Sequence, residues 1–215
     1  MEDKRIFICG PSGTGKTTLA EWISQTYRIP FITTSSKPLW EKHGIKSHLD
    51  LLHKGATEPQ FALDFQKELL YFRERALKGV ENFVTDRSPI DNLVYYLMQV
   101  SHQAEQSDTY EYINQCKELM EMGTKIIYTP FNANINLEND RMRIDSYYYQ
   151  HYTSGVFDYI LERNLLDLHT MYTNDDIMNL GEWDWNIRMA RVQWLLAEPN
   201  RLKKFLRKKW LKRNS

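Results

Sequence analysis

The sequence has little cysteine and no long apolar run. Its two cysteines, Cys9 and Cys116, show neither paired-ligand spacing nor a disulfide framework, so we expect reduced thiols. The six histidines form no short ligand pair, which leaves no indication of a zinc site. No apolar stretch reaches the roughly 18 residues of a membrane span, and the N-terminus does not resemble a signal peptide. We therefore expect no membrane partner and a cytoplasmic location, or the host cytoplasm if a phage encodes the protein.

The chain also lacks net charge, because 28 Lys and Arg residues balance 28 Asp and Glu residues. The charges are unevenly distributed. Residues 201–213, "RLKKFLRKKWLKR", carry eight basic side chains, and no acidic residue follows Glu198, so the rest of the chain holds 20 basic against 28 acidic residues. The apolar spacing in this segment predicts a basic helix over about 199–213. Such a helix would either dock on the acidic remainder of the protein or contact DNA phosphates.

Strand-like and helix-like segments alternate along the 215 residues, a length that suits a single domain, residues 1–215. Short apolar segments predict five strands, at 5–10, 30–36, 82–88, 124–130 and 165–173. Helical periodicity predicts helices that include 16–28, 59–77, 145–164 and 184–197. This alternation is typical of an α/β fold with a doubly wound, five-stranded parallel sheet flanked by helices.

The segment "CGPSGTGKTT" follows the first expected strand and opens a helix. It contains the phosphate-binding loop pattern, in which glycines let successive backbone N–H groups face phosphate oxygens. The Lys16 ammonium can reach the outer phosphates, and the Thr17 hydroxyl can hold Mg²⁺. We therefore expect ATP and Mg²⁺ as cofactors. The predicted ATP-binding residues are Gly10, Pro11, Ser12, Gly13, Thr14, Gly15, Lys16, Thr17 and Thr18.

The loop alone does not distinguish kinases, GTPases and motor ATPases. The sequence lacks the Asp-x-x-Gly and Asn/Thr-Lys-x-Asp motifs of GTPases, and it is too short for a large motor. In "FVTDRS", Asp86 and Arg87 end the third expected strand, at the sheet edge where the loop also lies. Asp86 could hold a metal-bound water or orient an attacking oxygen, and Arg87 could grip an acceptor phosphate. The alternative is a salt bridge at the strand end.

Asp86-Arg87-Ser88, followed by Asp91 and a Val-Tyr pair, resembles the Asp-Arg-Tyr…Ser…Ala-Tyr-Gln signature of thymidylate kinases. It is more similar to the Asp-Arg-Ser version in phage-type deoxynucleoside monophosphate kinases. With the phosphate loop and a basic lid, the resemblance spans about residues 5–175. It implies that Asp86 is the metal-associated catalytic carboxylate and that Arg87 binds the acceptor. Asp91 and Tyr96 replace the serine and glutamine of the thymidylate kinase signature, which speaks against thymine as the accepted base.

The resemblance also implies a lid at about 133–146, between the fourth strand and the next helix. The stretch "LENDRMRID" there supplies Arg141 and Arg143, which would close over the phosphates and exclude water. The alternative is a solvated loop of mixed charge, because acidic residues flank both arginines. The predicted catalytic residues are Lys16, Asp86, Arg87, Arg143 and Arg141, and the predicted metal ligands are Thr17 and Asp86.

The acceptor is expected between the loop "TTSSKPLW" and the 59–77 helix. The loop offers hydroxyl groups and a tryptophan ring, and the helix carries two polar residues that point away from its phenylalanine stripe. These two residues either read a base edge or a phosphate, or are solvated. The predicted acceptor-binding residues are Thr34, Ser35, Trp40, Gln66, Arg73, Arg87 and Asp91.

We therefore expect an ATP-dependent phosphotransferase that moves the γ-phosphate to a deoxynucleoside monophosphate. Two alternatives keep the kinase chemistry and change the acceptor to a free nucleoside or to a hydroxymethylated pyrimidine within DNA. The basic segment motivates the DNA alternative. A hypothesis of another class is an ATP-binding regulatory module with slow hydrolysis and a protein partner. The sequence leaves open whether the protein is a homodimer.

Overall fold

The computed structural model describes residues 3–132, 146–173, 175–181 and 184–197. A parallel sheet with strand order β2–β1–β3–β4 forms its centre. The strands are β1 (Arg5–Cys9), β2 (Phe83–Thr85), β3 (Lys125–Tyr128) and β4 (Ile177–Asn179). Ile6 pairs with Val84 on one side and with Lys125 on the other, so β1 lies between β2 and β3. All the loops that follow these strands therefore meet at one edge of the sheet.

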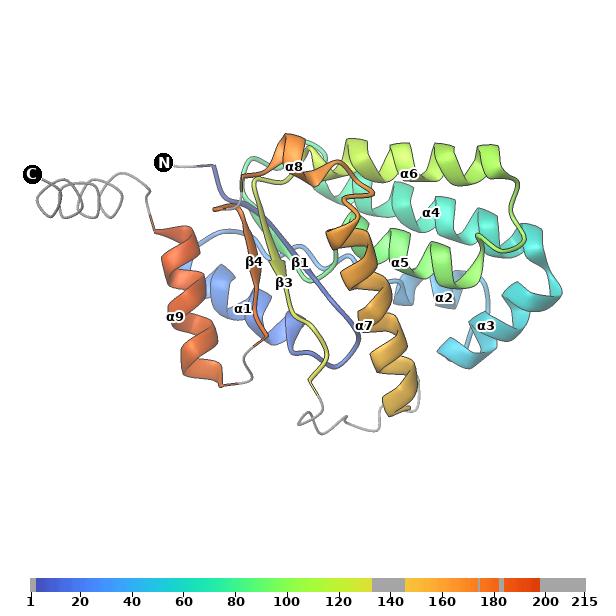
Figure 1. The fold of residues 1–215 in the computed structure, drawn as a ribbon, viewed down its shortest axis with the longest axis horizontal. Helices are drawn as coiled ribbons and strands as arrows, with labels where there is room; N and C mark the ends of the chain where they lie inside the picture. The colour runs from blue at the N-terminus through green and yellow to red at the C-terminus, as the bar shows by residue number, and fades with distance from the viewer. Residues whose placement is uncertain (1–2, 133–145, 174, 182–183, 198–215) are drawn as a thin grey trace, which may run out of the picture.

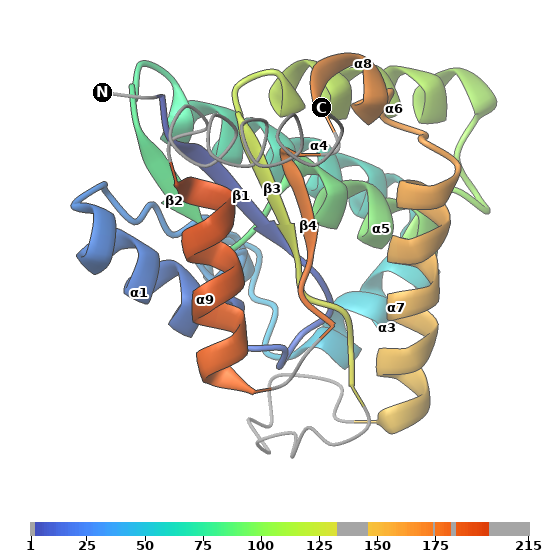
Figure 2. The ribbon, with the colours of Figure 1, turned by 60° about the vertical axis from the view of Figure 1, so that its left-hand side comes forward.

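Helices cover both faces of the sheet (Figure 1). They are α1 (Lys16–Tyr27), α2 (Lys37–Lys42), α3 (His48–Thr57), α4 (Pro59–Leu77), α5 (Pro89–Gln99), α6 (Gln106–Met120), α7 (Tyr147–Glu162), α8 (Leu168–Met171) and α9 (Trp185–Leu196). Figure 2 shows α1 and α9 on one face of the sheet, and α5, α6 and α7 on the other. The expected α/β fold, a parallel sheet with helices on both faces, is confirmed.

The alternation of side chains along β1 explains these two layers. Ile6 and Ile8 point to the face covered by α1 and α9, where they share a buried cluster with Leu19 and Val192. Phe7 belongs to the larger cluster on the opposite face, formed mainly by α4 to α7. Successive side chains of a strand point to opposite faces, so a strand buried on both sides reads as a continuous apolar run.

Two of the five predicted strands differ from the structure, which has four strands in the described residues. The segment 30–36 makes only an isolated parallel bridge, between Phe31 and Val84. Two backbone hydrogen bonds flank this bridge, from the Ile32 N–H to Val84 and from the Val84 N–H to Pro30. Beyond it, the Thr34 hydroxyl lies 3.0 Å from that of Thr85, and the Thr34 carbonyl accepts a hydrogen bond from Arg73.

The prediction of a strand at 165–173 is wrong. Its middle forms the short helix α8, and the edge strand β4 lies at Ile177–Asn179 instead. Asp167 adopts a left-handed conformation with φ of 51°, which turns the chain. Leu166, Leu168 and Tyr172 then pack into the large core cluster. The apolar residues that suggested a strand are buried against helices.

The segment from residue 37 to 57, whose first part we predicted as a polar loop, contains the helices α2 and α3. Ser47 caps α3, because its side chain accepts a hydrogen bond from the Asp50 backbone N–H. These two helices extend the molecule beyond the central sheet and build one wall of the site described below. No helix in the described ranges has both the length and the apolar character needed to cross a bilayer.

The close packing of Gly123 on β1 gives a test of this core. A Cβ atom at Gly123 would lie 2.4 Å from a ring carbon of Phe7 and 2.8 Å from the Tyr172 hydroxyl. We expect Gly123→Ala to lower the free energy of unfolding by about 1–3 kcal/mol, because Phe7 is fully buried and has no space to move. Urea-induced unfolding measures this change.

Gly155 in α7 provides the matched control, because a Cβ atom there would meet nothing within 4 Å. Gly155→Ala should be neutral or should stabilise the helix by up to about 1 kcal/mol. Equal effects of the two substitutions would contradict the packing of Gly123 described here.

Candidate active site

The loop between β1 and α1 is built on close contacts with the end of β3. Gly10 has φ of +141°, and a Cβ atom there would lie 2.2 Å from the Thr129 carbonyl oxygen. The hydroxyl groups of Thr14 and Thr129 lie 2.8 Å apart. Only glycine fits at position 10, because a side chain there would strain the backbone and would collide with Thr129. The predicted phosphate-binding residues, 10–18, all lie on this loop and the first turn of α1.

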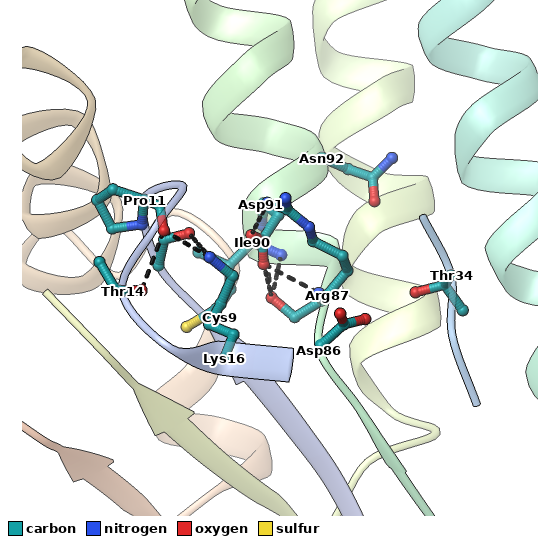
Figure 3. A network of polar contacts seen from close by, with 12 residues as sticks. Cys9, Pro11, Thr14, Lys16, Thr34, Asp86, Arg87, Ile90, Asp91 and Asn92 are labelled. Atoms are coloured by element: carbon teal, nitrogen blue, oxygen red, sulfur yellow. Dashed lines mark hydrogen bonds and ion pairs between the residues drawn. The ribbon is translucent and has the colours of Figure 1, made fainter. Parts of the chain in front are cut away.

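Lys16 is buried at the start of α1. Its ammonium group donates hydrogen bonds to the carbonyl oxygens of Gly10 at 2.7 Å and Pro11 at 2.5 Å (Figure 3). Burial, reinforced by the nearby Arg87 guanidinium, lowers the pKa of Lys16 to about 7. Negative phosphate groups placed in the loop would favour the charged ammonium form.

Asp86 follows β2 and lies beside the phosphate-binding loop. The Thr17 hydroxyl donates a hydrogen bond of 2.6 Å to Oδ2 of Asp86. The other oxygen, Oδ1, is buried and has no hydrogen-bond partner within the described part of the protein. A buried carboxylate oxygen without a partner is costly and suits a bound cation or a donor group.

These two residues fit Mg²⁺, a hard cation that prefers oxygen ligands. Thr17 offers a hydroxyl and Asp86 a carboxylate oxygen without another partner. No group of three or more His, Cys, Asp and Glu side chains with metal-site geometry occurs in the described ranges. Mg²⁺ bound here would therefore take further oxygen ligands from phosphates and water, as is usual for this ion.

Arg87 forms an ion pair with Asp91 one helical turn further along. Arg87 Nη1 lies 3.2 Å from Oδ1 of Asp91 (Figure 3). Oδ2 of Asp91 accepts hydrogen bonds from the Ser88 backbone N–H and hydroxyl, which completes a capping box at the start of α5. Burial acts to lower the pKa of Arg87, but the Asp91 carboxylate outweighs it and holds that pKa above its ordinary value.

A cavity of about 370 Å³ opens beside Asp86 and Arg87. Its walls come from the loop before α2 and from the helices α2, α3, α4 and α5. Five of the predicted acceptor-binding residues line it: Ser35, Trp40, Gln66, Arg73 and Arg87. The cavity is large enough for a small organic molecule and reaches the phosphate-binding loop at Ser12 and Thr17.

The two remaining predicted acceptor-binding residues do not line the cavity. Thr34 is buried, with its hydroxyl near Thr85 and its carbonyl bonded to Arg73. Asp91 is fully buried, where it accepts a hydrogen bond from Ser88 and forms an ion pair with Arg87. It therefore acts on the site by positioning these two residues.

Arg73 is buried and braces the cavity wall instead of projecting into solvent. Its guanidinium donates to the carbonyl oxygens of Thr34 at 3.2 Å and Ser88 at 3.4 Å, and to the side chain of Asn92. Burial lowers the pKa of Arg73, although Asp91 opposes this. Its hydrogen bonds tie α4 to the loop before α2 and to the start of α5.

Two further polar atoms of cavity-lining residues are buried without a hydrogen-bond partner in the described structure. They are the carbonyl oxygen Oε1 of Gln66 and the indole nitrogen Nε1 of Trp40. With Oδ1 of Asp86, three residues that line the cavity thus each have one buried polar atom without a hydrogen-bond partner among the described residues. Most buried polar atoms in proteins have partners, so these three atoms are exceptions.

The sequence analysis missed several residues of the site. His48, Tyr95, Gln99 and Lys37 line the cavity. Tyr95 and Gln99 lie four and eight residues beyond Asp91 on α5, so helical spacing could have indicated them. No comparable signal existed for His48, because α3 itself was not predicted.

Arg188 of α9 is a missed residue that supports the phosphate-binding loop. It is buried and donates hydrogen bonds to the carbonyl oxygens of Thr14 at 2.8 Å and Leu180 at 3.4 Å. The predicted lid arginines, Arg141 and Arg143, and the basic segment 199–213 lie outside the described residues.

Two solved structures illustrate the similarity of the fold to known proteins. Deoxyadenosine kinase from M. mycoides with bound dCTP has a TM-score of 0.57 and 14% sequence identity, over 87% of this chain and 96% of that chain. Thymidylate kinase from Candida albicans has a TM-score of 0.56 and 13% identity, over 89% and 91%. The protein therefore has the fold of P-loop nucleotide and nucleoside kinases.

Among curated protein sequences, none matches the chain significantly. A family model described as "AAA domain" matches residues 5–160, which include the phosphate-binding loop, the Asp86–Arg87 pair and every cavity-lining residue. Since this match covers well over half of the sequence, the protein belongs to the AAA domain family of P-loop proteins.

Proposed function

We propose that this protein is an ATP-dependent phosphotransferase whose acceptor is a deoxynucleoside monophosphate. The observation that carries the proposal is the position of Asp86. Its carboxylate contacts the phosphate-binding loop through Thr17 and lines the 370 Å³ cavity, with one buried oxygen left without a partner. A phosphotransferase needs such a group between the triphosphate and a second molecule.

In this mechanism the loop N–H groups and Lys16 hold the β- and γ-phosphates of ATP. Thr17 and Asp86 would hold Mg²⁺, which when bound neutralises phosphate charge. The cavity orients the acceptor so that its attacking oxygen lies beside Asp86. Asp86 orients this oxygen, which in a monophosphate is already ionised and carries no proton; with a nucleoside hydroxyl as the acceptor, Asp86 could also take up the proton. Positioning and charge neutralisation account for the rate in this class of reaction.

Arg87 is the proposed acceptor-phosphate group, because it lines the cavity next to Asp86 and keeps its positive charge. Arg73 acts through the hydrogen bonds that hold the wall in place. Lys37, at the start of α2, is the third cationic residue of the cavity lining, after Arg87 and Arg73. Arg141 and Arg143 stay proposed lid residues.

A nucleoside acceptor is the second candidate, and the Arg87–Asp91 ion pair favours it. Asp91 already compensates the Arg87 charge at 3.2 Å, and Arg73 donates to two carbonyl oxygens and Asn92. Because these buried cations already have partners, an acceptor without a phosphate group would leave neither of them uncompensated in the cavity.

Radiolabelled ATP with Mg²⁺ tests the proposal against a panel of nucleosides, deoxynucleoside monophosphates, and plain or hydroxymethylated DNA. We expect label on a monophosphate. Label on a nucleoside would show that the acceptor is a nucleoside and not a monophosphate. Label on hydroxymethylated DNA would support the DNA alternative. Release of labelled inorganic phosphate with no labelled acceptor would overturn the kinase proposal and favour the regulatory module.

Asp86→Asn tests the role of the carboxylate. Asparagine keeps the size of the side chain and an oxygen that accepts from Thr17, but it loses the negative charge that would hold Mg²⁺ and help to orient the attacking oxygen. We expect kcat to fall by about 10²-fold or more, while ATP still binds. Steady-state kinetics and calorimetry measure these effects. Asp108→Asn, which alters a surface ion pair with Lys67, is the control, and an equal loss in both variants would contradict the role of Asp86.

Arg87 is tested as a pair with Asp91, because removing Arg87 alone leaves a buried carboxylate without its cation. In the double variant Arg87→Met with Asp91→Asn, we expect KM for a monophosphate to rise at least about tenfold, because a charge-assisted contact is lost. KM for the matching nucleoside should change less than about threefold. Asp91→Asn alone is the control that keeps the guanidinium. Equal changes for both acceptors would exclude a phosphate contact by Arg87.

The depressed pKa of Lys16 predicts a pH dependence of ATP binding. The pKa is about 7 in the free protein, and bound phosphates should raise it by favouring the ammonium form. Above pH 7, binding then takes up a proton, so the Kd for Mg²⁺–ATP should rise by up to about tenfold for each pH unit. Calorimetry at pH 7–9 in buffers of different ionisation enthalpy measures both the Kd and the proton uptake.

Lys16→Arg is the matched control, because a guanidinium stays protonated over this range. This variant should show no proton uptake by residue 16 above pH 7. A wild-type Kd that is constant from pH 7 to 9 would contradict the link between Lys16 and phosphate binding.

A further inference from the structure

Arg188 on α9 holds the peptide group between Thr14 and Gly15. Its Nη1 atom donates a hydrogen bond of 2.8 Å to the Thr14 carbonyl oxygen, and Nη2 donates to the Leu180 carbonyl oxygen at 3.4 Å. The side chain is only 2% exposed, and a Cβ atom at Gly15 would lie 3.5 Å from Nη1. The guanidinium therefore lies against the phosphate-binding loop from its buried side.

The rest of α9 fixes the position from which Arg188 reaches the loop. The Asp184 side chain caps this helix by accepting hydrogen bonds from two backbone N–H groups of the first turn. Val192 on the buried face of α9 shares a cluster with Leu19 of α1. Figure 2 shows α1 and α9 on the same face of the sheet. Arg188 thus extends from a helix that packs against the helix following the loop.

The hydrogen bond from Arg188 also sets the direction of the Gly15 N–H. The Thr14 carbonyl and the Gly15 N–H belong to one peptide group, and in a trans peptide they point in opposite directions. Because Arg188 holds the carbonyl on the buried side, the N–H points away from α9. It makes no hydrogen bond within the described residues, so it can donate to a phosphate oxygen.

Glycine at position 15 makes this orientation depend on a contact outside the loop. Gly15 has φ of +82°, and without a Cβ atom it also adopts the negative φ that results when the peptide group turns over. The Thr14 hydroxyl donates to the Pro11 carbonyl and lies 2.8 Å from the Thr129 hydroxyl. These contacts fix the Thr14 side chain, whereas the guanidinium of Arg188 fixes the peptide group that follows it.

We infer that Arg188 is a positioning residue of the phosphate-binding loop: it holds the Thr14 carbonyl so that the Gly15 N–H donates to a phosphate oxygen of the nucleotide. The inference rests on the nucleotide site of the proposed function and does not depend on which acceptor is used. With the peptide group turned over, the Thr14 carbonyl oxygen would face the phosphates and repel them. Arg188 thus contributes to nucleotide binding without touching the nucleotide.

The Gly15 amide signal tests this orientation in the wild-type protein. Thr14–Gly15 is the one Thr–Gly pair in the sequence. Protein with ¹³C at the threonine carbonyls and ¹⁵N in glycine therefore gives a carbonyl-filtered NMR spectrum of this amide alone. We expect saturating Mg²⁺–ATP to move its proton downfield, the direction that a hydrogen bond to phosphate produces. A proton that stays in place or moves upfield would overturn the inference.

Arg188→Met removes the donor and keeps most of the side-chain length. We expect the Kd for Mg²⁺–ATP to rise by about tenfold to a hundredfold, because a charge-assisted hydrogen bond to phosphate is lost. The downfield shift of the Gly15 amide should also be lost. Calorimetry measures Kd at a temperature where circular dichroism shows the variant to be folded. Arg163→Met, which removes an exposed arginine at the end of α7, is the matched control and should leave Kd unchanged.

Two results in the folded Arg188→Met variant would contradict a positioning role. A wild-type Kd would show that the loop does not need Arg188. A weaker Kd with an unchanged downfield shift of the Gly15 amide would show a general effect on packing. Either result would overturn the inference.

Arg188→Lys covers the case in which Arg188→Met does not fold. A lysine ammonium can donate to the Thr14 carbonyl but lacks the fork that also reaches Leu180. This variant should keep the downfield shift of the Gly15 amide and bind Mg²⁺–ATP at least about threefold more tightly than Arg188→Met. A folded lysine variant whose Gly15 amide does not respond to Mg²⁺–ATP would overturn the inference.

The two proposals fail in different ways. Wild-type protein whose Gly15 amide moves downfield with Mg²⁺–ATP but which transfers no label to any acceptor would overturn the proposed function alone. Wild-type protein that transfers label to a monophosphate while the Gly15 amide does not respond to Mg²⁺–ATP would overturn the inference alone.

Discussion

The hydrogen bond of 2.6 Å between Thr17 and Asp86 is the contact on which the site depends. It joins the phosphate-binding loop to the cavity, and it exists because of the strand order. β1 lies between β2 and β3, so the loop after β1 meets Asp86 after β2 on one side and Thr129 after β3 on the other. A strand order without β2 beside β1 would separate the phosphate-binding loop from Asp86.

Buried charge is the second constraint on this region. Ionised groups are costly to bury unless they have partners. Lys16 is held by two loop carbonyls, and Asp91 by Arg87 and the cap of α5. Arg73 donates to the carbonyl oxygen of Thr34, three residues beyond the bridge between Phe31 and Val84. These contacts hold the cavity walls in place before a ligand binds. In phosphoryl-transfer sites, preorganised groups of this kind provide most of the rate enhancement.

The parts of the fold that the sequence predicted have strong local patterns. β1, the phosphate-binding loop and α1 follow from an apolar run, the glycine spacing and a helical repeat. The wrong strand at 165–173 had an equally apolar pattern, but Leu166 and Tyr172 pack against helices instead of pairing with a strand. A short apolar run does not itself reveal whether its partner is a helix or a strand, because both offer apolar surface. Contacts that are distant in sequence decide this.

Local patterns and contacts distant in sequence each account for a different part of the candidate site. The sequence by itself determined the phosphate-binding loop and the placement of Asp86 and Arg87 at the end of a strand, because glycine spacing and strand polarity are local properties. Only the tertiary structure decided that Arg87 pairs with Asp91, that Arg73 turns inward, and that hydrogen bonds join Gln66 to Gln99 and Gln99 to His48. Those last three residues are 33 and 51 positions apart in the sequence. Hydrogen bonds between residues so far apart in the sequence arise from the packing of whole helices. A local sequence pattern does not predict that packing.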